Sequence, residues 1–205
     1  MKIAVFVSGG GTNLQAIIDK IGSGEIHNVE ISEVIASNAG AFAIERAKKA
    51  GIPSKVISKK VLGDDYDDAT LDELNRLGVD LVVLAGFLSM LGPKTVAAYA
   101  NRIINIHPAL IPSFCGKGMY GIRPHEAVLA KGVKVSGATV HFVNEHYDEG
   151  PIILQKAVAV REDDTPETLQ KRIMVECEQV ILPKAIQLIA DGKIEVVNNL
   201  VRTKK

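Results

Sequence analysis

An amide and an imidazole, Asn105 and His107, stand two positions apart at the end of an apolar stretch, Arg102–Ile106, that predicts a strand. Alternation along a strand would place both side chains on one face. A single histidine in such a stretch is more often a core residue whose ring is hydrogen-bonded, because burying an unpaired polar group is costly. Together, however, an amide and an imidazolium could stabilise an oxyanion.

Three features favour the catalytic interpretation. The carboxyl ends of strands are where ligands bind in open α/β sheets. Pro108 directly follows His107 and opens a long aperiodic loop, 108–120, of a kind that is usually functional. A second polar cluster, 146–150, contains Asp148, a carboxylate that could hold the imidazole charged and raise its pKa. No serine or cysteine is obviously placed as a nucleophile, so we expect a substrate amine to attack directly.

A glycine-rich segment, Ser8–Asn13, joins the first predicted strand to the first predicted helix. Glycines allow close approach of main-chain N–H groups, and a helix N-terminus favours an anion. A dinucleotide motif is absent because Leu14 stands where the third glycine is needed, and no Gly-Lys-Ser/Thr marks an ATP loop. The segment therefore predicts a single-phosphate site near Gly11, Thr12 and Asn13, or, as the alternative, a tight turn in which Thr12 or Asn13 caps the helix.

The elements that must position these groups alternate between short β-branched runs and helical patterns, which predicts an α/β fold with a mainly parallel sheet. Pro93 is expected to open a short helix, and Pro183 to kink a long one. Strands are expected over Ile3–Val7, up to Val34–Ser37, and over Lys55–Ile57, Leu81–Ala85, Arg102–Ile106, Lys134–Val143 and Ile152–Val160; helices are expected over Asn13–Ile21, Ala41–Ala50, Asp65–Leu77, Pro124–Ala130 and Thr165–Ala190.

The composition argues against two classes of function, nucleic-acid binding and membrane insertion. The 24 basic and 24 acidic side chains balance, which argues against a nucleic-acid-binding surface, and the basic C-terminal residues (Arg202, Lys204, Lys205) are interpreted as a solvated tail. No apolar run is long enough to span a membrane, and no signal peptide is recognisable, so a cytoplasmic protein with no membrane partner is expected. The two cysteines, Cys115 and Cys177, are expected to be free thiols.

Five segments, in one order, resemble the glycinamide ribonucleotide formyltransferases: SGGGTNLQAI (8–17), LAGFLSMLGP (84–93), NIHPALIPSF (105–114), GATVHFV (137–143) and DEGPIILQ (148–155). The resemblance implies a single domain over 1–205 with a Rossmann-like, mainly parallel sheet and helices on both faces. Residues 1–100 would form its phosphate-binding half, and 101–205 its catalytic and folate-binding half.

The resemblance also implies roles. Asn105, His107 and Asp148 match the catalytic trio, which acts without a metal on 10-formyltetrahydrofolate and the substrate amine, in de novo purine synthesis. Substrate would bind at Gly10, Gly11, Thr12, Asn13, Pro108 and Glu178, the last at the ribose hydroxyls. The folate co-substrate would bind at Leu88, Ser89, Met90 and Leu91, and at Val140, His141, Phe142 and Val143. Both partners would be small molecules; homodimer formation is left open.

Two departures from the family pattern stand out. Val175 occupies a position where many relatives have Lys or Gln near the phosphate, so Lys171 or Lys117 is a candidate substitute. The loop CGKGMYGIRPH (115–125) is longer than usual, and its glycines suit a lid. A tRNA formyltransferase, a formyltetrahydrofolate hydrolase and a non-catalytic folate- or phosphate-binding module are the alternatives. The first two usually carry a further domain, and the third would be expected to lose one of the trio.

Overall fold

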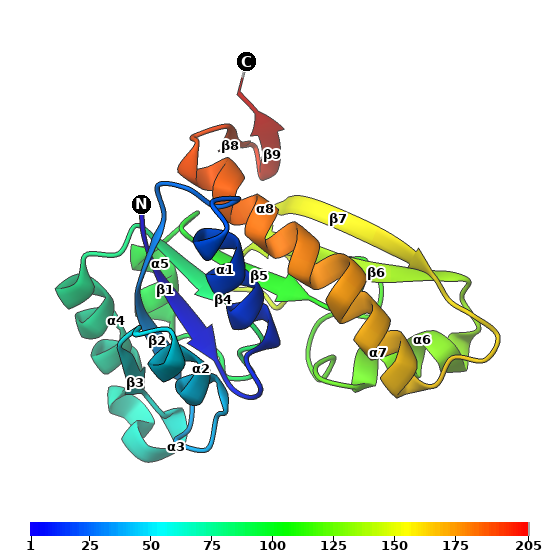
Figure 1. The fold of residues 1–205 in the computed structure, drawn as a ribbon, viewed down its shortest axis with the longest axis horizontal. Coiled ribbons are helices and arrows are strands. Elements are labelled where there is room, and N and C mark those ends of the chain that lie inside the picture. The colour runs from blue at the N-terminus through cyan, green and yellow to red at the C-terminus, as the bar shows by residue number, and fades with distance from the viewer. Residues whose placement is uncertain (205) are drawn as a thin grey trace. The chain divides into compact units, whose positions relative to one another are not determined.

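The computed structural model describes residues 1–204 of the chain. The chain forms two compact units, Met1–Asn105 and Ile106–Lys205, and the boundary between them falls inside one strand. Each unit contains its own strands and helices, coloured along the chain in Figure 1, and each is described by itself. The 1–100 and 101–205 halves expected from the sequence divide the chain five residues before this boundary.

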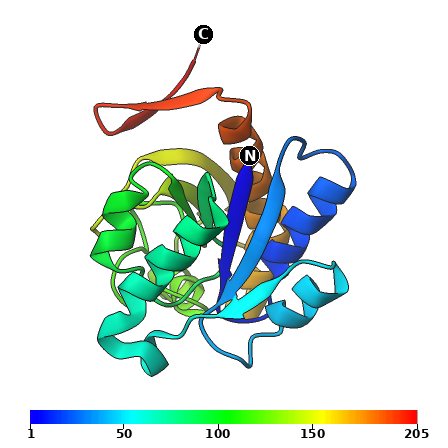
Figure 2. The same cartoon turned by 90° about the vertical axis from the view of Figure 1, so that its left-hand side faces the viewer.

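The first unit is a parallel α/β layer structure. Its strands are ordered β3-β2-β1-β4-β5, and the pairs β2–β3, β1–β2, β1–β4 and β4–β5 are all parallel, with Val5 opposite Val34 on one side and Val83 on the other. Helices α1 and α2 cover one face of this sheet, and α4 and α5 the other (Figure 2). In chain order the elements are β1 (Lys2–Val7), α1 (Thr12–Gly22), β2 (Glu30–Ala36), α2 (Ala43–Lys49), β3 (Ser54–Val56), α3 (Lys59–Leu62), a 3₁₀ turn (Gly63–Asp65), α4 (Tyr66–Leu77), β4 (Leu81–Leu84), α5 (Pro93–Ala98) and β5 (Ile103–His107).

The order of these strands indicates where a ligand is expected to bind. Strand β1 pairs with β2 on one side and with β4 on the other, so the chain reverses its direction of winding between β1 and β4. In open α/β sheets the loops that leave two such strands diverge and create a ligand site at their carboxyl ends. The glycine-rich segment follows β1, and the predicted folate segment, 88–91, follows β4.

The second unit is built on an antiparallel strand pair, β6 and β7, in which Thr139 faces Gln155. A helical segment and a small C-terminal hairpin complete it (Figure 1). Its elements are α6 (Arg123–Lys131), β6 (Val135–Phe142), β7 (Ile152–Ala159), α7 (Pro166–Ile173), a π-helical turn (Met174–Glu178), α8 (Gln179–Ala190), β8 (Ile194–Val197) and β9 (Leu200–Thr203). The α/β class and the mainly parallel sheet are thus confirmed, as is the short helix that opens at Pro93.

The C-terminal region differs from expectation in two respects. The long helix expected over Thr165–Ala190 is interrupted by the π-helical turn that precedes α8, the helix that contains Pro183. Because proline has no N–H, the carbonyl of Gln179 loses its partner four residues on, and a wider turn in this part of the helix accommodates the defect. Arg202 lies in strand β9 opposite Glu195, so the predicted solvated tail is in part a hairpin, while Lys205 lies outside the described residues.

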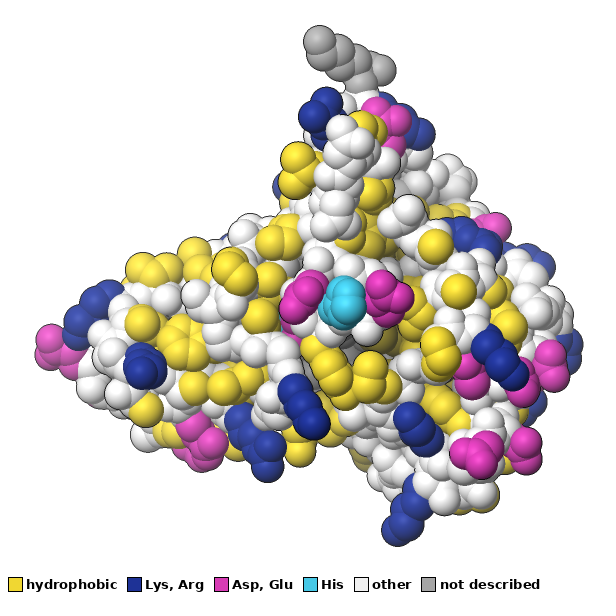
Figure 3. Space-filling model, turned by 180° about the vertical axis from the view of Figure 1, so that it is seen from behind, with side chains coloured by type: hydrophobic (Ala, Val, Ile, Leu, Met, Phe, Trp, Pro, Cys, Tyr) yellow, Lys and Arg dark blue, Asp and Glu magenta, His cyan; other side chains and the backbone are white. Residues whose placement is uncertain are grey.

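Side-chain types are mixed over the surface that Figure 3 draws: basic side chains are dispersed among acidic and apolar ones. This fits a chain with equal numbers of positive and negative side chains. Within residues 1–204, no helix has the length and apolar character that crossing a bilayer requires.

Candidate active site

Ser8 connects the ends of three strands in the first unit. Its hydroxyl accepts hydrogen bonds from the Ser37 hydroxyl (2.8 Å) and the Leu88 N–H (2.9 Å), and its carbonyl accepts one from the Asn38 amide (3.0 Å). Its own N–H donates to the carbonyl of Gly86 at 3.1 Å. The glycine-rich segment and the 88–91 segment, predicted separately as phosphate and folate sites, are therefore tied to one serine that sequence reasoning did not single out.

Gly11 meets two independent demands at the start of α1. Its φ is +69°, a left-handed conformation that glycine adopts without strain, and an added Cβ would lie 2.7 Å from the Cβ of Ala43. Gly11 is the N-cap of α1, and no side chain caps this helix within the described part of the chain. The alternative in which Thr12 or Asn13 caps the helix is therefore wrong, which leaves the terminal N–H groups without a side-chain cap.

The 88–91 segment leaves strand β4 as an irregular stretch with exposed apolar side chains. Leu88 is 60% exposed and Met90 41%, whereas Leu91 is buried. The preceding Phe87 is packed edge-on against Phe6, at 5.2 Å between ring centroids, which anchors the start of the segment in the core. Exposed apolar groups held on a fixed backbone are suited to a flat, largely apolar ligand.

Strand β5 carries both Asn105 and His107, as the sequence predicted. Their spacing of two positions puts them on the same face of the strand. Asn105 is half-buried, and His107 is only 3% exposed. Pro108 follows as the first residue of the irregular segment that leads to α6.

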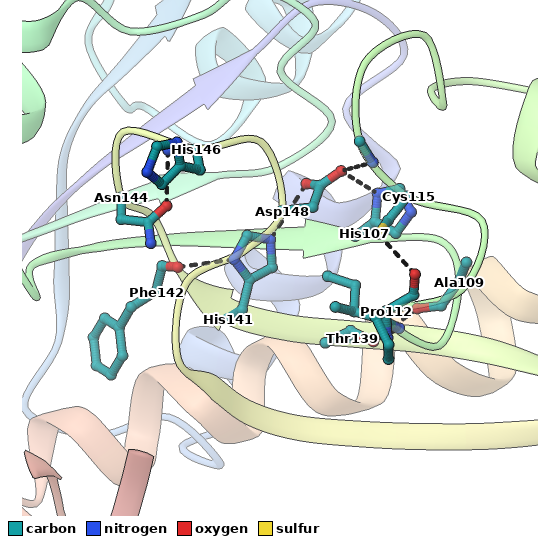
Figure 4. Close-up of polar contacts among 12 residues, drawn as sticks. His107, Ala109, Pro112, Cys115, Thr139, His141, Phe142, Asn144, His146 and Asp148 are labelled. Atoms are coloured by element: carbon teal, nitrogen blue, oxygen red, sulfur yellow. Dashed lines mark hydrogen bonds and ion pairs between the residues drawn. The ribbon is translucent and has the colours of Figure 1, made fainter. Parts of the chain in front are cut away.

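Asp148 lies between two histidines in the second unit (Figure 4). One carboxylate oxygen is 3.6 Å from Nδ1 of His107, and the other is 3.5 Å from Nε2 of His141. The first oxygen also accepts a hydrogen bond from the Gly116 N–H at 2.8 Å. Residue 148 has a φ of +56°, a conformation for which aspartate is enriched among the non-glycine residues. The predicted pairing of His107 with Asp148 is thus present, and His141 is a second partner.

The other ring nitrogen of each histidine faces a carbonyl. Nε2 of His107 lies 2.9 Å from the carbonyl of Phe114, and Nδ1 of His141 lies 2.8 Å from that of Phe142. A carbonyl only accepts, so these nitrogens must carry the protons. Either ring can then donate to Asp148 only when it is doubly protonated. The arrangement is accordingly one of two imidazoles that share a carboxylate, whose negative charge favours the charged form of His107.

Burial and charge oppose each other at this pair. Burial lowers the pKa of His107 and outweighs the Asp148 charge and the Phe114 carbonyl, which raise it. The expectation of a raised His107 pKa was therefore wrong, because desolvation of the ring was not foreseen. Burial acts to raise the pKa of Asp148, but hydrogen bonding to His141 and the charge of His107 outweigh it, and the pKa is lowered.

Two neighbouring groups are excluded as reactive centres by their surroundings. His125, on α6, is fully buried with neither ring nitrogen hydrogen-bonded, and burial, together with the charge of His107, lowers its pKa to about 4. Cys115 bonds through its thiol to the carbonyl of Pro112 at 3.2 Å. Burial and the charge of Asp148 raise the pKa of this thiol, which keeps it protonated and unreactive.

The remaining predicted site residues of the second unit differ in burial. Val140 and Phe142 are buried in strand β6, so a ligand could reach this segment only through its main chain or the half-buried Val143. Glu178 ends the π-helical turn, which also contains the 49% exposed Val175. Lys117 and Lys171 are both exposed. Among residues 1–204, no group of three or more His, Cys, Asp or Glu side chains is arranged so that it could hold a metal ion.

Glycine at position 150 is needed to set the Asp148 loop. An added Cβ there would lie 1.8 Å from the carbonyl oxygen of Phe142, so the loop approaches strand β6 more closely than any side chain would permit. The roles of Ser8 and Gly116 could not be read from the sequence, because each depends on main-chain groups brought in from a distant segment. His141 was predicted to line the folate site, but its contact with Asp148 was missed.

Comparison with known proteins agrees with this arrangement. The family model described as formyl transferase matches residues 1–186. The chain is 42% identical, over 95% of its length and 67% of the relative's, to a chloroplastic phosphoribosylglycinamide formyltransferase of Arabidopsis thaliana. It is 41% identical, over 97% of its length and 92% of the relative's, to the phosphoribosylglycinamide formyltransferase of Haemophilus influenzae.

Longer relatives also match. The chain spans only 19% of the trifunctional purine biosynthetic proteins to which it is 40–41% identical. Among solved structures, glycinamide ribonucleotide transformylase 1 of Symbiobacterium toebii superposes with a TM-score of 0.93 and 42% identity, over 100% of this chain and 94% of that one. With a family match that covers most of its residues and relatives alike along nearly its whole length, the chain belongs to the formyl transferase family.

Proposed function

We propose that the chain transfers the formyl group of 10-formyltetrahydrofolate to the amine of glycinamide ribonucleotide, a step of de novo purine synthesis. The observation that carries this proposal is the pairing of buried His107 with Asp148, at 3.6 Å, in a chain whose relatives are named for that reaction. A cytoplasmic location, and small molecules rather than nucleic acid or membrane as partners, belong to the same proposal.

In the proposed mechanism the substrate amine attacks the formyl carbon, and a new C–N bond forms. The carbonyl oxygen becomes an oxyanion, to which Asn105 donates a hydrogen bond, while the positive charge of protonated His107 stabilises it. Asp148 holds the charged form of the imidazole. The bond from the formyl carbon to folate N10 then breaks, and the proton lost by the amine reaches N10 with the help of Asp148 and water. The products are formylglycinamide ribonucleotide and tetrahydrofolate.

The substrate phosphate is assigned to Gly10, Gly11, Thr12 and Asn13. The uncapped start of α1 supports this assignment, because main-chain N–H groups and the helix dipole both favour an anion there. Pro108 and Glu178 are assigned to the rest of the substrate, with Glu178 at the ribose hydroxyls.

The pterin ring of the co-substrate is assigned to the segment Leu88–Ser89–Met90–Leu91 and to Val140, His141, Phe142 and Val143. In the first of these segments, exposure of Leu88 and Met90 supports the assignment. The shared serine, Ser8, would then fix the phosphate segment and the folate segment relative to each other within the first unit.

The test is a transfer assay with synthetic glycinamide ribonucleotide and a 10-formyl folate, followed by the absorbance change on deformylation. We expect turnover only when both are present. His107→Ala should lower kcat by at least about a hundredfold, the usual cost of losing one group that stabilises the oxyanion. His146→Ala is the matched control, because His146 is exposed and lies 3.5 Å from the exposed Glu145.

Other outcomes distinguish the alternatives. Deformylation that does not need the amine would indicate a hydrolase, and folate binding without turnover would indicate a binding module. Wild-type rates in His107→Ala would refute the mechanism while leaving the family membership intact.

A further inference from the structure

Helix α2 fixes two consecutive carbonyls of the glycine-rich segment. The N–H of Ala43 donates to the carbonyl of Gly9 at 3.1 Å, and Nε–H of Arg46 donates to the carbonyl of Gly10 at 2.7 Å. A second guanidinium nitrogen, Nη1, donates to the side-chain oxygen of Gln15 on α1 at 3.0 Å. Arg46 thus holds the segment from one side and the first turn of α1 from the other.

Because the peptide group is planar, these contacts also fix the direction of the N–H groups on the opposite side of the segment. In a trans peptide the C=O and the following N–H point in opposite directions. With the carbonyls of Gly9 and Gly10 directed at α2, the N–H groups of Gly10 and Gly11 are directed away from it. Successive N–H groups that point the same way form a concave site for an anion.

Arg46 also brings a positive charge to this segment. Both of its hydrogen bonds end on neutral acceptors, a main-chain carbonyl and a side-chain amide, so neither neutralises the guanidinium. The guanidinium carbon lies 5.2 Å from the centre of the Phe42 ring, a cation–π contact that restricts its position. Phe42 itself is 52% exposed, which keeps this side of the guanidinium near the surface.

We infer that Arg46 is a positioning residue for the phosphate of the substrate: it orients the Gly10 and Gly11 N–H groups towards the anion and supplies the nearby positive charge. The inference rests on the proposed function for its choice of substrate. It assigns to α2 the cationic support that the sequence led us to seek at Lys171 or Lys117. Any ligand recognised in this way is a phosphate monoester or a similar oxyanion.

The test compares Arg46→Met, which keeps the aliphatic stem, with Arg46→Lys, which keeps the charge and one donor. Arg46→Met should raise the KM for glycinamide ribonucleotide about tenfold to a hundredfold, the loss typical of a charge-assisted hydrogen bond, and Arg46→Lys by less. The kcat and the KM for the folate should change less than about twofold. Lys48→Ala is the control, because Lys48 is exposed on the same helix.

Two measurements separate positioning of the phosphate from a purely structural role. With the dephosphorylated substrate, glycinamide riboside, wild type and Arg46→Met should have equal kcat/KM. Inorganic phosphate, titrated while the amide resonances of Gly10 and Gly11 are observed by NMR, should bind wild type at least about tenfold more tightly than Arg46→Met. A structural defect would instead affect both substrates alike and lower Tm.

The outcomes for the inference and for the proposed function are distinguishable. Equal phosphate affinity in wild type and Arg46→Met would overturn the inference even if the formyl transfer is observed. Loss of phosphate affinity in the variant would support it even if no formyl transfer is found. Should Arg46→Met fail to fold, Arg46→Gln replaces it, because this variant keeps an amide donor near the Gly10 carbonyl but removes the positive charge. A phosphate affinity equal to that of wild type in Arg46→Gln would overturn the inference.

Discussion

Removing the charge of Asp148 should lower the pKa of His107. In Asp148→Asn the carboxylate that lies 3.6 Å from Nδ1 of His107 becomes a neutral amide of almost the same size. Two unit charges at that distance interact by about 4.6 kcal/mol at an effective dielectric constant of about 20. At about 1.36 kcal/mol per pKa unit, this sets an upper bound of about three units. Measured effects of an opposite charge at such distances are about one to three units.

The sign of the effect follows from which form is active. Protonated His107 is present below its pKa, so kcat/KM should decline as the pH rises through that value. Burial already places the pKa of His107 below its ordinary range, and Asp148 opposes that shift. Without the carboxylate the decline moves to lower pH by about one to three units, and activity near neutral pH falls about tenfold to a thousandfold from protonation alone.

The assay is the pH dependence of kcat/KM, together with an NMR titration of the His107 ring. Glu149→Gln is the matched control, since it removes a charge from the adjacent, exposed position. The reasoning is refuted if the His107 pKa in Asp148→Asn falls by less than about half a unit or rises. Equal shifts in Asp148→Asn and Glu149→Gln would show that distance and burial do not govern the interaction.

Two predictions concern the scaffold around the site. Gly150→Ala should lower Tm and kcat/KM together, because its Cβ would lie 1.8 Å from the Phe142 carbonyl oxygen, whereas Gly22→Ala, which meets nothing within 4 Å, should alter neither. Asp164→Asn should lower the free energy of unfolding by about 1–2 kcal/mol at pH 7, measured with urea, because its carboxylate is 1% exposed and paired with Arg172. That pairing lowers the Asp164 pKa from 3.8 to about 2. The contribution of Asp164 to the free energy of unfolding is therefore present above pH 3.8 and is lost as the pH falls to about 2. A difference in the free energy of unfolding between wild type and Asp164→Asn that persists at pH 2 would contradict this.

The single carboxylate of Asp148 contacts two imidazole rings, those of His107 and His141. Both His107 and His141 direct one nitrogen at a carbonyl and the other at this carboxylate. Because each ring carries a proton on the nitrogen that faces a carbonyl, each donation to Asp148 requires an additional proton on that ring. Burial opposes the additional proton on His107, and it outweighs the charge of Asp148 in lowering the pKa of that ring.

Local pattern was sufficient for much of the fold. The apolar run at Ile3–Val7 predicted the first strand, and β1 spans it, with all five residues 0% exposed. Proline at position 93 could open a helix but not continue one, and α5 begins there. Asn105 and His107 were placed on one face because strand alternation is a property of the backbone alone.

What depended on tertiary structure was the environment of those same groups. The sequence of 205 residues places Asn105, His107 and Asp148 in the right elements, but the direction of the His107 pKa shift depends on how far the folded chain removes the ring from water. The contacts of Ser8 with Leu88 and of Arg46 with Gly10 involve main-chain groups, which every residue carries and which no pattern of side chains can identify. Side-chain order along the chain thus determined the elements and the reactive groups, whereas desolvation and main-chain contacts between distant segments were decided only when the chain folded.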